Sequence, residues 1–277
     1  MADEQEKLWK KLTFTEDEGE DIELGSNSKR AAKEIGKNCV VMKILTQRTI
    51  IIEALRKNLK MLWKPNKGVQ ISEIEEDLFL VEFGDGRDKK KVMEMCPWSY
   101  EKQLILMQEF EGEMVPKEIK LQWVPFWVQM YNLPLKSMTR EAGYEIGLKL
   151  RKVLEVDAVE KGVQWGKFLR VRICIDATRK LIKGKKVSIE GGESRWIFFK
   201  YERLPNFCYR CGMLDHGEKD CLEKKGEEPS RGEQMQYRAW MRGEPGRCLG
   251  QDYENKRGDS SLENRDASKR YSLEPSI

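Results

Sequence analysis

Three cysteines and a histidine lie close together in the segment Cys208-Tyr-Arg-Cys-Gly-Met-Leu-Asp-His-Gly-Glu-Lys-Asp-Cys221. Their spacing is C-x2-C-x4-H-x4-C, and the histidine is the only one in the chain. Three thiolates and an imidazole are a ligand set that tetrahedral Zn²⁺ prefers. Four protein ligands leave no open coordination position, so we expect a structural zinc site. Its ligands are Cys208, Cys211, His216 and Cys221.

This spacing is typical of a zinc knuckle. Gly212 follows the second cysteine, where the chain must turn sharply and a left-handed backbone costs glycine little. Asp215 stands where zinc knuckles usually carry glycine, but aspartate tolerates turn conformations. Two alternatives are ordinary buried cysteines beside a surface histidine, and a disulfide. The sequence shows no signal peptide, so we expect reduced thiols in the nucleus or cytoplasm rather than in a secreted protein.

The side chains around this loop suit an unpaired nucleic-acid strand. An aromatic and an apolar side chain on a small rigid loop can sandwich an unstacked base, and nearby cations can bind its phosphates. The alternative is that the same side chains pack the knuckle against the preceding domain. The candidate contacts are Tyr209, Arg210, Met213, Leu214 and Lys219.

Charge is segregated along the chain. Residues 26–221 carry 37 bases and 27 acids, whereas residues 1–25 are acidic and residues 222–277 are balanced. The excess positive charge coincides with the apolar periodicity, which indicates that the folded part binds a polyanion. No apolar run approaches the ~20 residues that span a bilayer, so we expect no membrane association.

Residues 33–112 predict an α+β domain. Strands are expected at 39–45, 69–74, 78–83 and 103–107, and helices at 50–63 and 87–95. The order βαββαβ is that of an RRM-like or ferredoxin-like sandwich. Leu78 and Leu80 occupy outward positions where RRM domains carry base-stacking aromatics. We therefore expect this apolar face to be covered by the next module or, alternatively, to bind another protein.

Residues 120–204 predict a second, basic α+β module. Strands are expected at 126–131, 153–159, 169–176 and 195–201, with a helix at 139–150 and a basic hairpin loop at 179–186. The strand at 169–176 alternates, so one face packs while the other presents Arg170 and Arg172. Lys185 and Lys186 lie in the loop, and Trp196 and Phe198 share one strand face. Guanidinium groups beside aromatics suit a single-strand site, although a structural sheet with solvated arginines is equally consistent.

The remaining segments complete the expected organisation. Residues 1–32 form an N-terminal arm, residues 205–222 form the knuckle, and residues 223–277 lack periodicity and are expected to be disordered. Tyr237 and Trp240 in this tail are a candidate short contact.

Several motifs together resemble a known family. They include Trp63-Lys-Pro, Cys96-Pro-Trp-Ser-Tyr100 and Trp127-Val-Gln-Met-Tyr-Asn-Leu-Pro134, followed by Gly166–Asp176 and then Phe199–Gly212 leading into the knuckle. They resemble a plant-expanded domain of unknown function followed by a CCHC zinc knuckle, as found in LINE-type (non-LTR) retrotransposon proteins. The resemblance implies zinc and nucleic-acid binding, in an element or a domesticated copy of one.

Two functions remain open at this point. The first is zinc-dependent binding of single-stranded RNA or DNA, RNA above all, through the knuckle and the basic sheet. The second is a protein–protein assembly module, with self-association, in which zinc only stabilises the fold. We expect no catalysis and no small-molecule substrate, because the knuckle uses the sole histidine and the sequence has no Gly-rich phosphate loop followed by Lys-Ser/Thr.

Overall fold

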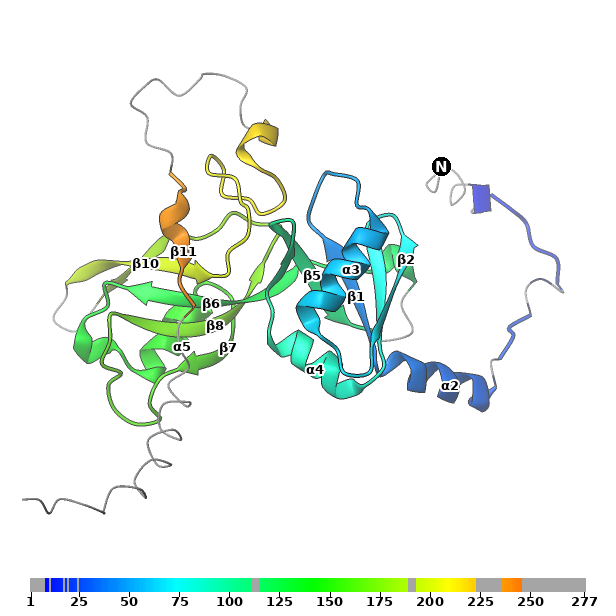
Figure 1. Ribbon diagram of the computed structural model, residues 1–277, viewed down its shortest axis with the longest axis horizontal. Coiled ribbons are helices and arrows are strands. Elements are labelled where there is room, and N and C mark those ends of the chain that lie inside the picture. Colours follow the sequence, from blue (N-terminus) through cyan, green and yellow to red (C-terminus); the bar gives the residue numbers. More distant parts are fainter. Residues whose placement is uncertain are drawn as a thin grey trace, which may run out of the picture.

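Two β-sheets with few helices make up a mixed α+β fold (Figure 1). The computed structural model describes residues 8–9, 11–16, 18, 20–23, 25–110, 115–188, 193–222 and 236–245. Within these residues, every helix is too short or too polar to cross a bilayer.

The first domain is a five-stranded antiparallel sheet with the strand order β2-β3-β1-β5-β4. Helices α3 and α4 pack on one face, because Leu55 and Leu59 of α3 and Val92 of α4 join the core formed by alternate strand residues. Both helices and four of the strands lie where the hydrophobic patterns predicted them. The elements are β1 (Cys39–Ile44), α3 (Ile52–Trp63), β2 (Val69–Glu75), β3 (Leu78–Phe83), α4 (Gly86–Glu94), β4 (Trp98–Tyr100) and β5 (Gln103–Glu109).

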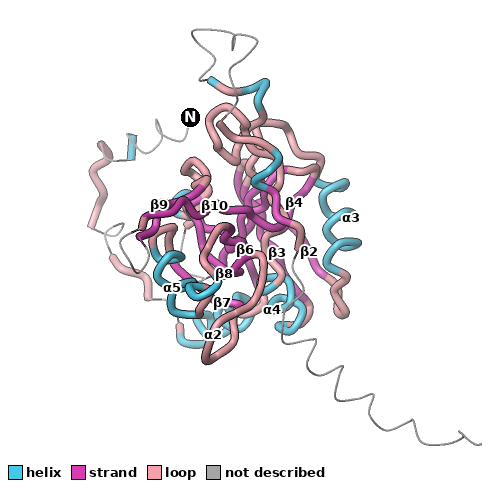
Figure 2. The backbone as a smooth tube through the Cα atoms, turned by 90° about the vertical axis from the view of Figure 1, so that its left-hand side faces the viewer, coloured by secondary structure: helices cyan, strands magenta, loops and turns pink. Residues whose placement is uncertain are grey.

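The second domain is built on a sheet with the order β11-β10-β6-β8-β7, to which β9 adds beside β10. Helix α5 lies along β7 and β8 (Figure 2). Gly143 and Gly147 permit this close approach, since an added Cβ would meet Val156 at 2.9 Å and Val153 at 2.6 Å. The elements are β6 (Trp123–Tyr131), α5 (Arg140–Leu148), β7 (Lys152–Asp157), β8 (Phe168–Asp176), β9 (Gly184–Ser188), β10 (Ser194–Glu202) and β11 (Arg242–Gly243).

The two domains share buried surface. Leu104 and Leu106 point from β5 away from α3 and α4, and both are fully buried in the hydrophobic core of the second domain. Arg172 of β8 donates a hydrogen bond to the carbonyl of Glu94 at the end of α4. The second domain therefore covers the part of the apolar sheet face around β5, which is the arrangement favoured from the sequence.

Four elements lie outside the sequence prediction. Helix α2 (Ser26–Gly36) occupies part of the expected N-terminal arm, β4 was not predicted, and β9 begins within the loop expected at 179–186. The fourth, β11, corrects the prediction of disorder from residue 223 onward. Residues 236–245 are ordered, because Tyr237 and Met241 are buried in the second domain and β11 pairs in parallel with β10. The rest of that predicted tail, residues 223–235 and 246–277, lies outside the described residues.

Candidate zinc and nucleic-acid interface

The four predicted zinc ligands converge on one point. The ligand atoms of Cys208, Cys211, His216 and Cys221 all lie within 4.8 Å of one another. The three cysteines are buried, and Met213 packs against them. Three soft thiolates and one imidazole, with only the histidine partly exposed, fit a structural Zn²⁺ and would hold it with four protein ligands.

A tight turn brings the first two ligands together. The amide of Gly212 donates to the carbonyl of Cys208 at 2.8 Å, and the amide of Cys208 donates to the carbonyl of Met213 at 2.8 Å. Gly212 has φ +82°, the left-handed conformation that the sequence predicted for this glycine. A Cβ at this position would also lie 2.4 Å from the ring of Tyr237, so glycine is required for packing as well as for the turn.

Asp215 orients the histidine. Its carboxylate oxygen lies 2.8 Å from Nδ1 of His216, and Nε2 of the same ring lies 3.4 Å from the Cys211 sulfur. A carboxylate on one ring nitrogen fixes the imidazole so that the other nitrogen faces the metal. The sequence showed this aspartate as a departure from the usual glycine, and the structure gives it a positioning role.

The Cys211 thiol needs a cation to ionise at neutral pH. Burial, together with the neighbouring Cys208 and Cys221 thiols, raises the pKa of Cys211 to about 12. A thiol with this pKa stays protonated at neutral pH, whereas a zinc ligand must be a thiolate. Zinc binding should therefore displace protons from the site.

Residues 236–245 fasten the knuckle to the second domain, and we call this segment the clasp. Arg242 donates to the Tyr209 hydroxyl at 2.6 Å and to the carbonyls of Leu204 and Pro205 at 3.3 and 3.1 Å. Tyr237 lies beneath Gly212 and is buried. The knuckle therefore packs against the second domain and is not an independent module on a flexible linker.

Docking changes the roles of the predicted knuckle contacts. Leu214 is fully buried in the domain core and so is not available to a base, which corrects that prediction. Tyr209 is half-buried, and its ring packs edge-on against Phe207 with centroids 4.9 Å apart. The packing alternative therefore holds for Leu214 and accounts for the main contacts of Tyr209. Arg210 and Met213 are half-buried, and Lys219 is exposed on a short 3-10 turn.

Arg170 is also corrected, because the structure places it inside. Only 7% of this residue is exposed. Its guanidinium makes two hydrogen bonds to Glu202 at 2.8 and 2.9 Å and one to Asp157 at 3.0 Å, and it stacks over Trp127 at 3.8 Å. The charge and the N–H donors of Arg170 are thus occupied by the two carboxylates and the Trp127 ring. Arg170 therefore stabilises the sheet and does not present its charge to a ligand.

The other three predicted cations of the second domain have different surroundings. Arg172 is half-buried at the junction with α4. Lys185 and Lys186 are exposed on β9, and Lys186 lies directly opposite Trp196 of β10. The two lysines thus stay available to a polyanion.

An aromatic row crosses the outer face of the second sheet beside Lys186. Phe198 pairs with Tyr131 of β6, and Tyr131 pairs with Phe168 of β8, the last two rings being 5.1 Å apart. Lys200 lies over the Tyr131 ring at 4.7 Å. The sequence identified only the two β10 aromatics, because the pairing of β6 with β10 is a tertiary contact. We call this set the outer row; it consists of Phe168, Tyr131, Phe198 and Trp196.

The outer row is open to solvent at its β10 end. Trp196 is 56% exposed and Phe198 is 46% exposed, which is unusual for two large aromatic side chains on one strand. At the opposite end of the same sheet face, Pro125 and Arg172 line a hollow together with residues of α4. The open end is therefore the part of this face on which unpaired bases could stack.

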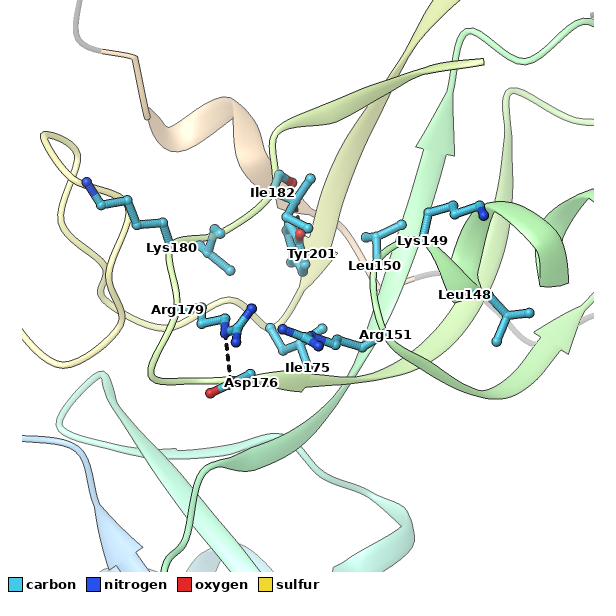
Figure 3. A pocket seen from close by; sticks show the side chains of 11 residues that line it. Leu148, Lys149, Leu150, Arg151, Ile175, Asp176, Arg179, Lys180, Ile182 and Tyr201 are labelled. Atoms are coloured by element: carbon cyan, nitrogen blue, oxygen red, sulfur yellow. Dashed lines mark hydrogen bonds and ion pairs between the residues drawn. The ribbon is translucent and has the colours of Figure 1, made fainter. Parts of the chain in front are cut away.

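A separate hollow of about 350 Å³ lies beside the end of β8 (Figure 3). Arg179 pairs with Asp176 there at 3.2 Å, and Arg151 lies next to them. Partial burial opposes ionisation of Asp176, but hydrogen bonds from Thr178 and the nearby arginines outweigh it and lower its pKa. The lining also includes Lys149 and Lys180, so basic side chains outnumber the one carboxylate, which is already paired with Arg179.

Comparisons with known proteins agree with this layout. Residues 32–118 match a domain of unknown function (DUF4283), and residues 175–223 match a zinc knuckle. The knuckle match begins well before the first cysteine and includes β9 and β10. The chain is also 28% identical over 134 residues to "Uncharacterized protein At4g02000" of Arabidopsis thaliana, an alignment covering 48% of this chain and 42% of that protein.

Proposed function

We propose that this protein binds single-stranded nucleic acid, RNA above all, and that zinc supports the binding by holding the knuckle on the second domain. The observation that carries the proposal is the open end of the outer row, where Trp196 and Phe198 lie exposed beside Lys186. Every base has a flat face, so exposed rings flanked by cations bind unpaired strands with little sequence preference. The match to a zinc knuckle supports the same ligand class.

Binding rather than catalysis is proposed because the sole histidine of the chain belongs to the metal cluster. The Cys208, Cys211, His216 and Cys221 set would hold one structural Zn²⁺, which cross-links the loop and supplies no reactive position. Reduced, metal-binding cysteines of this kind suit the reducing nucleus or cytoplasm, where we place the protein.

The first domain is proposed to be RRM-like in topology only. Its four main strands have the spatial order β2-β3-β1-β5, with both helices on one face, which is the ferredoxin-like arrangement. The face that RRM domains use for bases is partly buried here, since Leu104 and Leu106 belong to the core of the second domain. The bases would therefore bind to the second domain.

We also propose an origin in a LINE-type retrotransposon. The support is the succession of a DUF4283 and a CCHC zinc knuckle in one chain, together with the motifs that resemble such elements. A reverse-transcriptase reading frame adjoining the gene or its near relatives would support this origin, and a consistently unrelated genomic context would speak against it.

The binding proposal is tested with a fluorescently labelled, unstructured RNA and the doubly substituted variant Trp196→Ala/Phe198→Ala. Each lost base contact should cost ~1–3 kcal/mol, which corresponds to a loss of roughly 5- to 150-fold in affinity. Tyr144→Ala is the matched control, because Tyr144 is 50% exposed on α5, away from the outer face. Equal affinities for wild type, control and double variant would overturn the assignment.

Self-association through the outer row is the second candidate. Exposed aromatic side chains can also bury one another between two copies of the chain. Sedimentation equilibrium distinguishes the two. Oligomers that dissociate on Trp196→Ala/Phe198→Ala, without any RNA affinity in the wild type, would favour assembly.

A further inference from the structure

A further cleft lies where the first domain, the end of β10 and the knuckle meet. It has a volume of about 720 Å³. Trp98 and Lys102 line it from the first domain, Arg203 from the residue after β10, Tyr209 from the knuckle and Arg242 from the clasp. In Figure 1 the knuckle segment, drawn in yellow, lies beside this junction of the two sheets.

Only one sign of charge lines this cleft. Lys102, Arg203 and Arg242 contribute three cations, and the lining contains no carboxylate. Within the part of the chain that the structure describes, none of the three has an ion-pair partner. Grouped positive charges without a counter-charge in the lining attract an anion.

The two arginines are held in place by neutral acceptors. Arg203 donates to the carbonyl of Met95 at 2.8 Å and lies 5.6 Å from the centre of the Trp98 ring. Arg242 donates to two carbonyls and to the Tyr209 hydroxyl. A guanidinium has five N–H donors, so each arginine is oriented while donors remain for a ligand. Planar guanidinium groups fixed in this way match the geometry of phosphate oxygens.

The backbone places two of these cations in an uncommon conformation. Lys102 has φ +64° and Arg203 has φ +53°, both in the left-handed region that glycine adopts at lower cost. The turn between β4 and β5 requires positive φ, and lysine stands there where glycine or asparagine is the usual choice. The amide of Asn206 donates to the carbonyl of Lys102 at 2.7 Å, which ties the two walls together. Unfavourable backbone angles that converge on one cleft are typical of ligand sites.

We infer that this cleft binds a phosphodiester group of the nucleic-acid strand whose bases contact the second domain. The inference rests on the proposed function and deepens it, because it adds the first domain and the clasp to the strand's path. Lys102 and Arg203 would bind the phosphate oxygens with the remaining donors of Arg242, and Tyr209 would border the adjacent sugar or base.

The test measures RNA affinity against salt concentration for wild type, Lys102→Gln, Arg203→Gln and the double variant. Each phosphate contact contributes about 0.7 to the slope of log K against log salt for single strands. The slope should therefore become shallower by about 0.7 in each single variant and by about 1.4 in the double variant. Arg203→Lys should restore much of the slope, since it keeps the charge.

Lys136→Gln is the matched control, because Lys136 is exposed on a 3-10 turn and does not line the cleft. Lys102 is exposed on a turn, so the Lys102→Gln variant should fold normally. If Arg203→Gln proves unstable, the salt slope of Lys102→Gln alone still tests the inference. Wild-type slopes in both cleft variants would overturn the inference while leaving the proposed function intact, whereas a wild type that binds no RNA would overturn the proposed function itself. A nucleoside monophosphate that binds as tightly as the RNA would show a free-nucleotide pocket and contradict the strand path.

Discussion

Replacing Arg170 with methionine tests whether this arginine is a structural residue or a nucleic-acid contact. The side chain is 7% exposed and pairs with Glu202, which is 3% exposed. The two groups form parallel hydrogen bonds at 2.8 and 2.9 Å, and Asp157 binds the same guanidinium at 3.0 Å. Arg170→Met keeps much of the apolar bulk but removes the guanidinium that pairs with the buried Glu202 carboxylate, which also accepts a hydrogen bond from Gln129.

The expected cost follows from the uncompensated carboxylate. Removing one partner of a buried ion pair destabilises a protein by about 3–5 kcal/mol, because the remaining charge stays buried. Adding Glu202→Gln to Arg170→Met should recover part of this loss, since the double variant no longer buries that charge. Arg172→Met is the control on the same strand face. It removes one interdomain hydrogen bond and should cost about 0.5–1.5 kcal/mol.

Urea unfolding followed by circular dichroism measures these differences, and RNA titration at low urea measures affinity among molecules that are still folded. We expect Arg170→Met to lower the unfolding midpoint strongly and to leave RNA affinity of the folded protein close to that of wild type. A loss of stability below about 1 kcal/mol, combined with a clear loss of RNA affinity, would refute the structural role.

Three further predictions concern the knuckle, the clasp and α4. Gly212→Ala should lower stability by about 1–3 kcal/mol in thermal unfolding, because its methyl group would meet the Tyr237 ring; an unchanged melting temperature would contradict the docking contact. Met241→Ala should cost about 2–5 kcal/mol by the same assay, since Met241 is fully buried, and a change below 0.5 kcal/mol (about the size of an ordinary surface effect) would argue against an ordered clasp. Hydrogen bonds from Arg87 lower the pKa of Asp85 from 3.8 to about 2. The ionised N-cap should therefore stabilise α4 fully above pH 3.8 and lose this effect as the pH falls through 2. An NMR titration midpoint of Asp85 near 4 would contradict this prediction.

Local patterns predicted the regular elements well. The alternation in β8 identified which residues face the core. The helix expected at 139–150 begins at Arg140, and Thr139 caps it by accepting a hydrogen bond from the amide of Ala142 at 3.2 Å. The zinc ligands could be read from their spacing, since all four lie on one short loop and need no long-range contact to meet. Regular elements, helix caps and a metal site on a single loop depend on interactions between residues close in sequence, so they can be predicted from the sequence.

Tertiary contacts account for what the sequence did not predict. Alternation separates Arg170 and Arg172 from the core face, but it gives no information on what covers the outer face. Glu202 and Asp157, which pair with Arg170, come from two other strands. The clasp was predicted only in part. Tyr237 was a candidate contact and is buried, whereas the other candidate, Trp240, is 40% exposed. The second anchor, Met241, was not predicted, because isolated apolar residues give no periodicity within a charged segment. The outer row likewise exists only once β6, β8 and β10 have paired.

The central claim is that the folded chain binds unpaired strands through charge and stacking, and the salt dependence of wild-type RNA binding tests it most directly. The zinc-loaded protein would be titrated with an unstructured RNA of about 12 nucleotides, a length within the range that such sites occupy. We predict binding at low salt that weakens steeply and linearly in log K against log salt, as displaced counterions require. No binding at low salt, or an affinity that salt leaves unchanged, would contradict the account.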